Sequence, residues 1–243
     1  GIRFVSPEAE NSYKIRAKRL IDVYAVEEPD RVPVNVNINS LPFYLDGKDY
    51  YTAIYYPEKA LEAADNFNRK YADILESYFT PMLIPAAVFD MLDYKFYNWP
   101  GHGLSKKSSG YQFIEGEYMK ADEYDDLILD PTDFWLRKFL PRAFGALAPL
   151  QKLEPLTDMV EIVNMQCADL ADPDIQNVFQ ILANAGKDLQ KFFGVFADSF
   201  RKSTELGVPR IGGIFCKAPF DTIGDSLRGT TGVMKDMYRQ PDK

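Results

Sequence analysis

The feature that most limits the fold is an unbroken apolar run over residues 82–89 (MLIPAAVF), which ends directly in Asp90. A strand of a parallel sheet reads this way, because helices cover both of its faces. Two further stretches read as strands: residues 32–38 (VPVNVNI), in which apolar residues alternate with asparagine, and residues 207–216 (GVPRIGGIFC). The sequence therefore predicts three strands of a parallel sheet.

Helices are predicted before and between these strands. Residues 7–26 and 57–78 place apolar side chains at spacings of three and four, and Pro57 stands at a first helical position. Another helix opens at Pro131, with Asp130 as its expected cap, and a long helical stretch covers residues 173–206. Strands that alternate with helices predict an α/β fold with the helices outside a parallel sheet.

Composition excludes several classes of partner and location. The chain of 243 residues is 46% hydrophobic, which is enough to bury a sizeable core. Its net charge is −8 and its charged residues are interspersed, so no basic stripe indicates nucleic-acid binding. No apolar run reaches the roughly 20 residues of a membrane helix, and the first residues carry no secretion signal. Cys167 and Cys216 form no disulfide pattern, so we expect a cytoplasmic protein.

The number of strands suggests an incomplete barrel. A (β/α)8 TIM barrel needs eight strands, whereas this sequence offers three. We therefore expect residues 1–243 to be the N-terminal part of a single TIM-barrel domain, its first three β/α units, with an enlarged insertion at 98–205 after the second strand. A missing C-terminal barrel segment or a second chain would then cover the open sheet edge. The alternative is a small doubly wound α/β domain.

Three segments carry a family resemblance: residues 30–40 (DRVPVNVNINS), 85–96 (PAAVFDMLDYKF) and 211–243. The last is the most specific, since it contains A-P-F at 218–220, L-R-G at 227–229 and Y-R-Q-P at 238–241. Together they resemble the uroporphyrinogen decarboxylase superfamily, whose members are porphyrinogen decarboxylases and corrinoid-linked methyltransferases on a shared barrel. The resemblance implies that the chemistry lies at the C-terminal ends of the strands.

Two departures from the family pattern argue against porphyrin chemistry. The decarboxylases carry an R-Q-A-G-R type motif after the first strand, whereas residues 35–40 (NVNINS) contain no arginine. A substrate with eight carboxylates would lack its strongest partners there. Gly224 and Asp225 also stand where the decarboxylases place a tyrosine. We therefore expect no conversion of uroporphyrinogen to coproporphyrinogen.

The favoured function is accordingly methyl transfer, corrinoid- or thiol-linked. A cofactor-free decarboxylase acting on a tetrapyrrole or a small acid is one alternative. The other is a non-catalytic barrel homologue that serves as a binding or assembly subunit.

The candidate catalytic residue is Asp90, which the resemblance equates with the functional aspartate after the second strand. Without the resemblance it would read as a helix cap. Asn35, Asn37 and Asn39 share one face of the first strand, so they form either an amide row in the barrel mouth or a solvated edge. His102, the single histidine, has either an acid/base or lid role near the substrate or an exposed place in its loop.

Further substrate-binding candidates follow the second and third strands. They are Asp93, Phe220, Asp221 and Arg228, the last of which would contact an anion or form a helix ion pair. Glu115 and Glu117 share a face and are either paired carboxylates or solvated ones.

No metal site is predicted within this chain. Zinc needs three or four converging ligands, and His102, Cys167 and Cys216 have no ligand spacing. In the resembling methyltransferases the zinc ligands lie in later barrel strands. The resemblance therefore implies zinc only in a completed barrel, and a corrinoid either as substrate or on a partner corrinoid protein.

Overall fold

The computed structural model describes residues 2–161, 167–211 and 216–243. Helices hold 59% of the residues, and the strands within the described ranges form one small mixed sheet of three. The fold is helix-rich α/β, so the expected partial (β/α)8 barrel is wrong. The chain divides into two compact units. Unit 1 comprises Gly1–Ala86, Ser105–Gly110 and Leu189–Ile214, and unit 2 comprises Ala87–Leu104, Tyr111–Asp188 and Phe215–Lys243.

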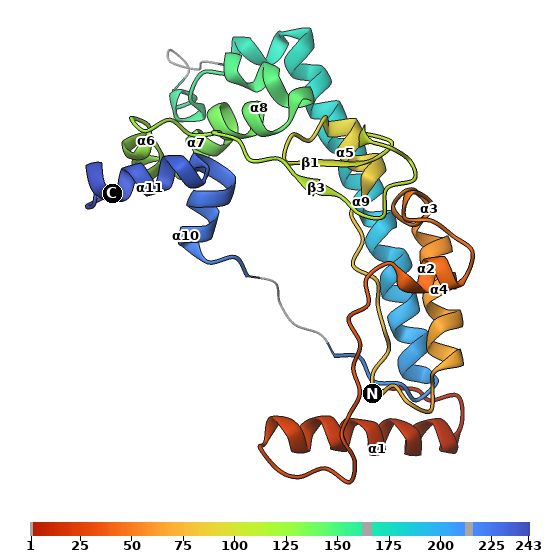
Figure 1. The fold of residues 1–243 in the computed structure, drawn as a ribbon. Coiled ribbons are helices and arrows are strands. Elements are labelled where there is room, and N and C mark those ends of the chain that lie inside the picture. The colour runs from red at the N-terminus through yellow and green to blue at the C-terminus, as the bar shows by residue number, and fades with distance from the viewer. Residues whose placement is uncertain (1, 162–166, 212–215) are drawn as a thin grey trace. The chain divides into compact units, whose positions relative to one another are not determined.

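Unit 1 is built mainly from helices (Figure 1), two of which, at 41–45 and 50–55, the sequence does not predict. Its helices are α1 (Pro7–Tyr24), α2 (Leu41–Leu45), α3 (Tyr50–Tyr55), α4 (Pro57–Lys70) and the part of α9 (Pro173–Glu205) that follows Asp188. The Ser6 side chain accepts a hydrogen bond from the Ala9 N–H at 3.2 Å, which caps α1 ahead of a proline at its first position. The predicted helices at 7–26 and 173–206 are confirmed.

Helix α4 starts at Pro57 as predicted but ends at Lys70, earlier than residue 78. The side chain of buried Asn68 explains the change of direction. Its amide donates to the Phe79 carbonyl oxygen at 2.9 Å, and its oxygen accepts from the Phe79 N–H at 2.7 Å. This pairing holds the returning chain against α4.

Three segments of unit 1 lie side by side without forming regular strands. Val34 pairs with Leu75 as a parallel bridge, and the Val34 oxygen accepts from the Glu76 N–H at 2.9 Å. On the other side, the Tyr78 N–H donates to the Pro209 oxygen at 3.0 Å. The first predicted strand thus reduces to one bridge residue. In the third predicted strand, residues 207–211 form no strand, and residues 212–215 lie outside the described residues.

A buried carboxylate fixes these segments. The Glu76 side chain is fully buried and accepts from Arg19 at 2.7 Å and from Arg31 at 2.9 Å. Arg16 of α1 donates to the carbonyl oxygens of Ala72, at 2.7 Å, and Leu75. Charges from α1 and from the segment after it therefore converge on the turn that follows α4.

Unit 2 contains the small sheet and many short helical turns. Strands β1 (Tyr97–Pro100), β2 (Gly103–Leu104) and β3 (Gln112–Phe113) lie in the order β2-β1-β3, with β1 parallel to β2 and antiparallel to β3. The α-helices are α5 (Ala86–Leu92), α6 (Tyr124–Leu129), α7 (Pro131–Phe134), α8 (Leu140–Ala143), the start of α9, α10 (Pro219–Asp221) and α11 (Thr230–Arg239). Short segments of other helix types are η1 (Trp135–Phe139), η2 (Gly145–Lys152), η3 (Leu156–Asp158), η5 (Ala168–Ala171) and η6 (Thr222–Arg228).

The expected second strand is also wrong, because residues 86–92 form helix α5. A short apolar run fits a buried helix as well as a buried strand, so periodicity alone does not decide between them. Pro85 is followed by Ala86 and Ala87, and the segment ends in Met91 and Leu92, residue types that favour helix. The expected parallel pairing of the second and third strands is therefore not formed, and Ala218 instead precedes helix α10. The predicted cap is confirmed, since the Asp133 N–H donates to the Asp130 side chain at 3.0 Å.

An aromatic cluster and a buried ion pair hold unit 2 together. The core residues are Phe96, Tyr118, Met119, Tyr124, Phe134, Phe139, Ala143 and Leu227. Next to them, Glu123 accepts two hydrogen bonds from Arg142, at 2.7 and 2.8 Å, and one from the Lys120 N–H at 2.8 Å. The Arg142 guanidinium lowers the pKa of Glu123 from 4.5 to about 2.

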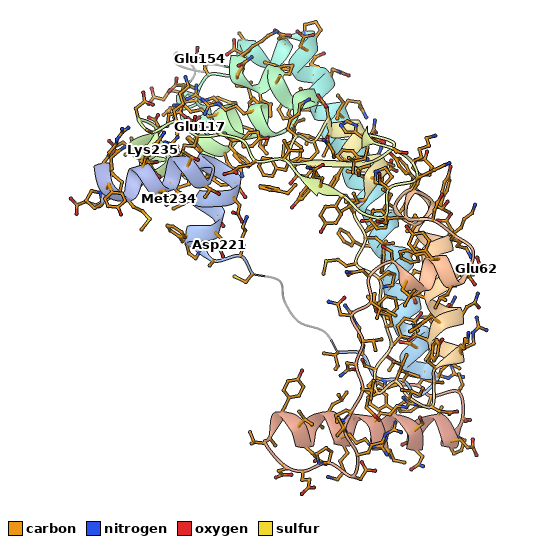
Figure 2. The ribbon with its side chains drawn as sticks, viewed as in Figure 1. Glu62, Glu117, Glu154, Asp221, Met234 and Lys235 are labelled. Atoms are coloured by element: carbon orange, nitrogen blue, oxygen red, sulfur yellow. The ribbon has the colours of Figure 1, made fainter. Side chains whose placement is uncertain are left out.

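We predict that Glu76→Gln lowers the free energy of unfolding by about 3–5 kcal/mol, because Arg19 and Arg31 lose a buried carboxylate. Urea unfolding measures the change. The matched control is Glu62→Gln on α4, which is labelled in Figure 2. Glu62 is 63% exposed and lies 3.3 Å from Lys48, so its loss should cost at most about 1 kcal/mol. Equal effects of the two substitutions would contradict the structural role of Glu76.

We predict a second stability effect that depends on pH. The pKa of Glu123 is lower in the folded state, so its contribution is complete above pH 4.5 and is lost as the pH falls toward 2. Glu123→Gln should remove up to about 3 kcal/mol at neutral pH and flatten the decline of stability over that window. Urea titrations at a series of pH values test this, and an unchanged pH profile in the variant would refute it.

Candidate functional site

A carboxylate and the single histidine meet in unit 2. Asp90 lies on α5, and His102 lies in the turn between β1 and β2. The Nδ1 atom of His102 is 3.2 Å from Oδ1 of Asp90, and the two side chains are 35% and 38% exposed. The structure thus brings together two of the predicted site residues, and both remain open to solvent.

The backbone around His102 is fixed by a tight turn. Trp99 and His102 exchange backbone hydrogen bonds of 2.8 Å in both directions. Gly101 and Gly103 have φ values of 92° and 73°, which glycine adopts without strain. A side chain at Gly103 would also overlap Asn98. The Gly-His-Gly sequence is therefore what allows this turn.

The imidazole is held on a buried aromatic ring. Its ring lies 4.1 Å from that of Trp99, centre to centre, with only 9° between the planes. Trp99 is fully buried, so it provides a rigid surface. The imidazole ring has one face on Trp99, and its Nδ1 atom lies toward Asp90. Its Nε2 atom has no hydrogen-bond or ion-pair partner among the described residues.

This arrangement suits proton transfer. A carboxylate at Nδ1 favours the tautomer with its proton on that atom and leaves Nε2 as the base. The same carboxylate stabilises the imidazolium that forms when Nε2 takes a proton. The pair can therefore accept a proton and later return it.

The nearby candidate Asp93 has a structural place. Its φ of 50° ends α5, its carboxylate pairs with Lys95, and its carbonyl oxygen accepts from the Gly145 N–H at 2.9 Å. On α10, Phe220 is 54% exposed and Asp221 is exposed.

Arg228 lies in a buried ion-pair network. It pairs with Asp236 and Glu117, and it donates to the Met119 carbonyl oxygen at 2.7 Å. Glu117, labelled in Figure 2, is thus the partner of an arginine. Glu115 accepts instead from the Thr230 N–H, so the two glutamates have separate roles.

The three asparagines line a groove of about 380 Å³ in unit 1. Asn35, Asn37 and Asn39 are all exposed, and Asn35 accepts a hydrogen bond from the Ser77 hydroxyl. The other lining residues are Val36, Ser77, Tyr78, Phe79, Thr80, Met82, Arg210 and Ile211. The three asparagines therefore border a concave surface and are exposed to solvent, although no strand forms there.

Sequence reasoning missed two polar residues of this groove. Thr80 has a buried hydroxyl oxygen with no hydrogen-bond partner in the described part of the chain. The guanidinium carbon of Arg210 lies 3.4 Å from the centre of the Phe200 ring. Neither residue stands in a motif, and only the pairing of distant segments reveals them.

The search for relatives and for metal ligands gives no positive result. Protein-family models, curated protein sequences and solved structures yield no match to this chain. Among the described residues, no three His, Cys, Asp or Glu side chains gather as metal ligands. Within the same ranges, no helix combines the length and apolarity needed to cross a membrane.

The stacking of His102 on Trp99 predicts a fluorescence difference at fixed pH, because the imidazole covers one face of the indole. In a Trp135→Phe background, which leaves Trp99 as the only tryptophan, His102→Asn should change the emission of Trp99. Asp122→Asn, an exposed aspartate of the same unit, should leave the emission unchanged. Equal emission with and without His102 would contradict the stacking.

Proposed function

We propose that the protein is an enzyme of the uroporphyrinogen decarboxylase-like type that transfers a methyl group, with the His102–Asp90 pair as its general base. The observation that carries this proposal is the 3.2 Å contact between His102 and Asp90, which leaves Nε2 open. The family resemblance supplies the reaction class. The proposal rests on residue types and on this pair, and not on a barrel.

The reaction joins a thiol to a methyl group carried by a corrinoid substrate. The Nε2 atom of His102 takes the thiol proton, and the resulting thiolate attacks the methyl carbon. A carbon–sulfur bond forms while the carbon–cobalt bond breaks, and both of its electrons stay on cobalt, which passes from Co(III) to Co(I). Asp90 stabilises the imidazolium until the proton is released.

The resemblance also implies zinc. The described residues do not fit it, since no group of three suitable ligands gathers among them. No step is therefore derived through zinc.

The arrangement of cations favours methyl transfer over porphyrinogen decarboxylation. Residues 35–40 contain no arginine, whereas the decarboxylases of the resembling family carry an R-Q-A-G-R type motif there. A substrate with eight carboxylates needs several such partners. A corrinoid protein as partner and a cytoplasmic location are part of the same proposal, the latter based on two free cysteines.

A cofactor-free decarboxylase of a small acid is the second candidate. Loss of carbon dioxide leaves a carbanion that needs a proton, and protonated His102 beside Asp90 can supply it. The same pair serves both reactions, so the products distinguish them.

We predict that the full-length protein demethylates methylcob(III)alamin with 2-mercaptoethanol under anaerobic conditions, forming cob(I)alamin and the methyl thioether. His102→Gln should lower kcat by about 10²–10⁴-fold, and Asp90→Asn should also lower it, because the general base is lost or loses its orientation. Absorbance follows the corrinoid, and mass spectrometry follows the thioether.

The matched control is Asp122→Asn, an exposed aspartate of the same unit, which should leave kcat unchanged. Carbon dioxide release from an acid substrate in place of methyl transfer would favour the second candidate. Equal activity in wild type and His102→Gln would remove the pair from the mechanism.

A further inference from the structure

We propose that the groove of unit 1 binds a small hydroxylated monocarboxylate, whose charge is taken by Arg210 and whose hydroxyl group is bound by the asparagine row. The inference does not depend on the His102–Asp90 chemistry, because it concerns a separate set of residues within unit 1.

The charge of the groove argues for an anion. Arg210 is the only charged residue among those that line it, so no carboxylate there competes for the guanidinium. Arg210 also forms no ion pair with any described residue. By contrast, Arg19 and Arg31 of the same unit pair with Glu76, and Arg201 pairs with Glu205. In a chain of net charge −8, an arginine without a carboxylate partner is available to a ligand.

The orientation of Arg210 favours a carboxylate. Its guanidinium lies over the Phe200 ring at 3.4 Å, and such stacking occupies the face of the group. The Arg210 N–H groups donate no hydrogen bond to a described side chain or backbone oxygen, so they are available to a ligand. Two parallel hydrogen bonds from that edge match the two oxygens of a carboxylate.

The remaining polar groups suit a hydroxyl. Asn37 and Asn39 line the groove without a hydrogen bond to a described side chain, and each amide offers both donors and an acceptor. The Oγ1 atom of Thr80 is buried and unpartnered, a costly state that a polar atom from a ligand or water relieves. Asn35 is partly engaged through Ser77. These groups recognise an uncharged polar substituent and add no charge.

The size of the groove limits the ligand. A volume of about 380 Å³ is near the lower end of the roughly 300–1,000 Å³ of small-molecule sites. Met82 and Ile211 add an apolar part to the lining, which fits a short carbon chain. The chemistry is therefore that of a short hydroxy acid with one carboxylate.

The test compares 4-hydroxybutanoate with 4-hydroxybutanamide, which has a similar shape but no charge. Ligand-observed NMR titration of the full chain gives both affinities. We expect the acid to bind about tenfold more tightly than the amide, because charge-assisted hydrogen bonds are lost with the carboxylate. Inorganic phosphate, as a third probe, should bind more weakly than the acid because it lacks the hydroxylated chain.

Three variants assign the effect. Arg210→Gln should lower the affinity for the acid to that for the amide. Arg210→Lys should retain part of the preference for the acid, because lysine keeps the positive charge but lacks the two parallel N–H donors of the guanidinium. Arg201→Gln, a matched arginine of the same unit, should change neither affinity. The exposed position of Arg210 leaves the fold intact, which circular dichroism verifies. Equal binding of acid and amide to wild type, unchanged binding in Arg210→Gln, or no binding of either probe at millimolar concentration would overturn the proposal.

Discussion

Much of unit 1 depends on one buried carboxylate. Glu76 is fully inaccessible to solvent, a state that is costly for a charge unless cations and hydrogen bonds compensate it. Arg19 comes from α1, and Arg31 comes from the segment that leads to Val34. Because both arginines pair with the buried carboxylate, α1 and the segment before Val34 are held against the turn after α4. The bridge between Val34 and Leu75 follows, and it places the asparagine row beside residues 77–80.

The helices could be predicted from the sequence because their signals are local. The starts of α1 and α4 are marked by Pro7, with Ser6 before it, and by Pro57, and neither start needs a distant partner. The side chain of Asp130 likewise caps α7, as its position before Pro131 indicates. The strands could not be predicted in the same way. The run at 82–89 is apolar enough for a buried strand, but a strand requires neighbours that supply its backbone hydrogen bonds, and residues 86–92 form a helix instead.

The candidate sites were predictable in residue type but not in arrangement. The alternation of asparagines in 35–39 predicts one face of a strand, but no strand forms there, and Val36 lines the groove together with the three asparagines. Nothing in the sequence indicates that Asp90 contacts a histidine twelve positions later, because the contact depends on the turn that Gly101 and Gly103 permit. The position of Arg210 could not be predicted from the sequence either. It depends on the hydrogen bond between Tyr78 and Pro209 and on the contact with the Phe200 ring of α9.

The buried carboxylate and the groove are coupled through the chain between them. Residues 75–80 carry Glu76 near one end and Thr80 at the other. Between them, the Glu76 N–H donates to the Val34 oxygen and the Tyr78 N–H donates to the Pro209 oxygen, which holds the two outer segments of the groove beside this one. A ligand that binds only the assembled groove stabilises the folded state of unit 1 in proportion to its occupancy. By the same linkage, whatever loosens the contacts of Arg19 and Arg31 with Glu76 lowers the fraction of molecules able to bind. Residues 75–80 therefore contribute both to the stability of this unit and to the shape of the groove.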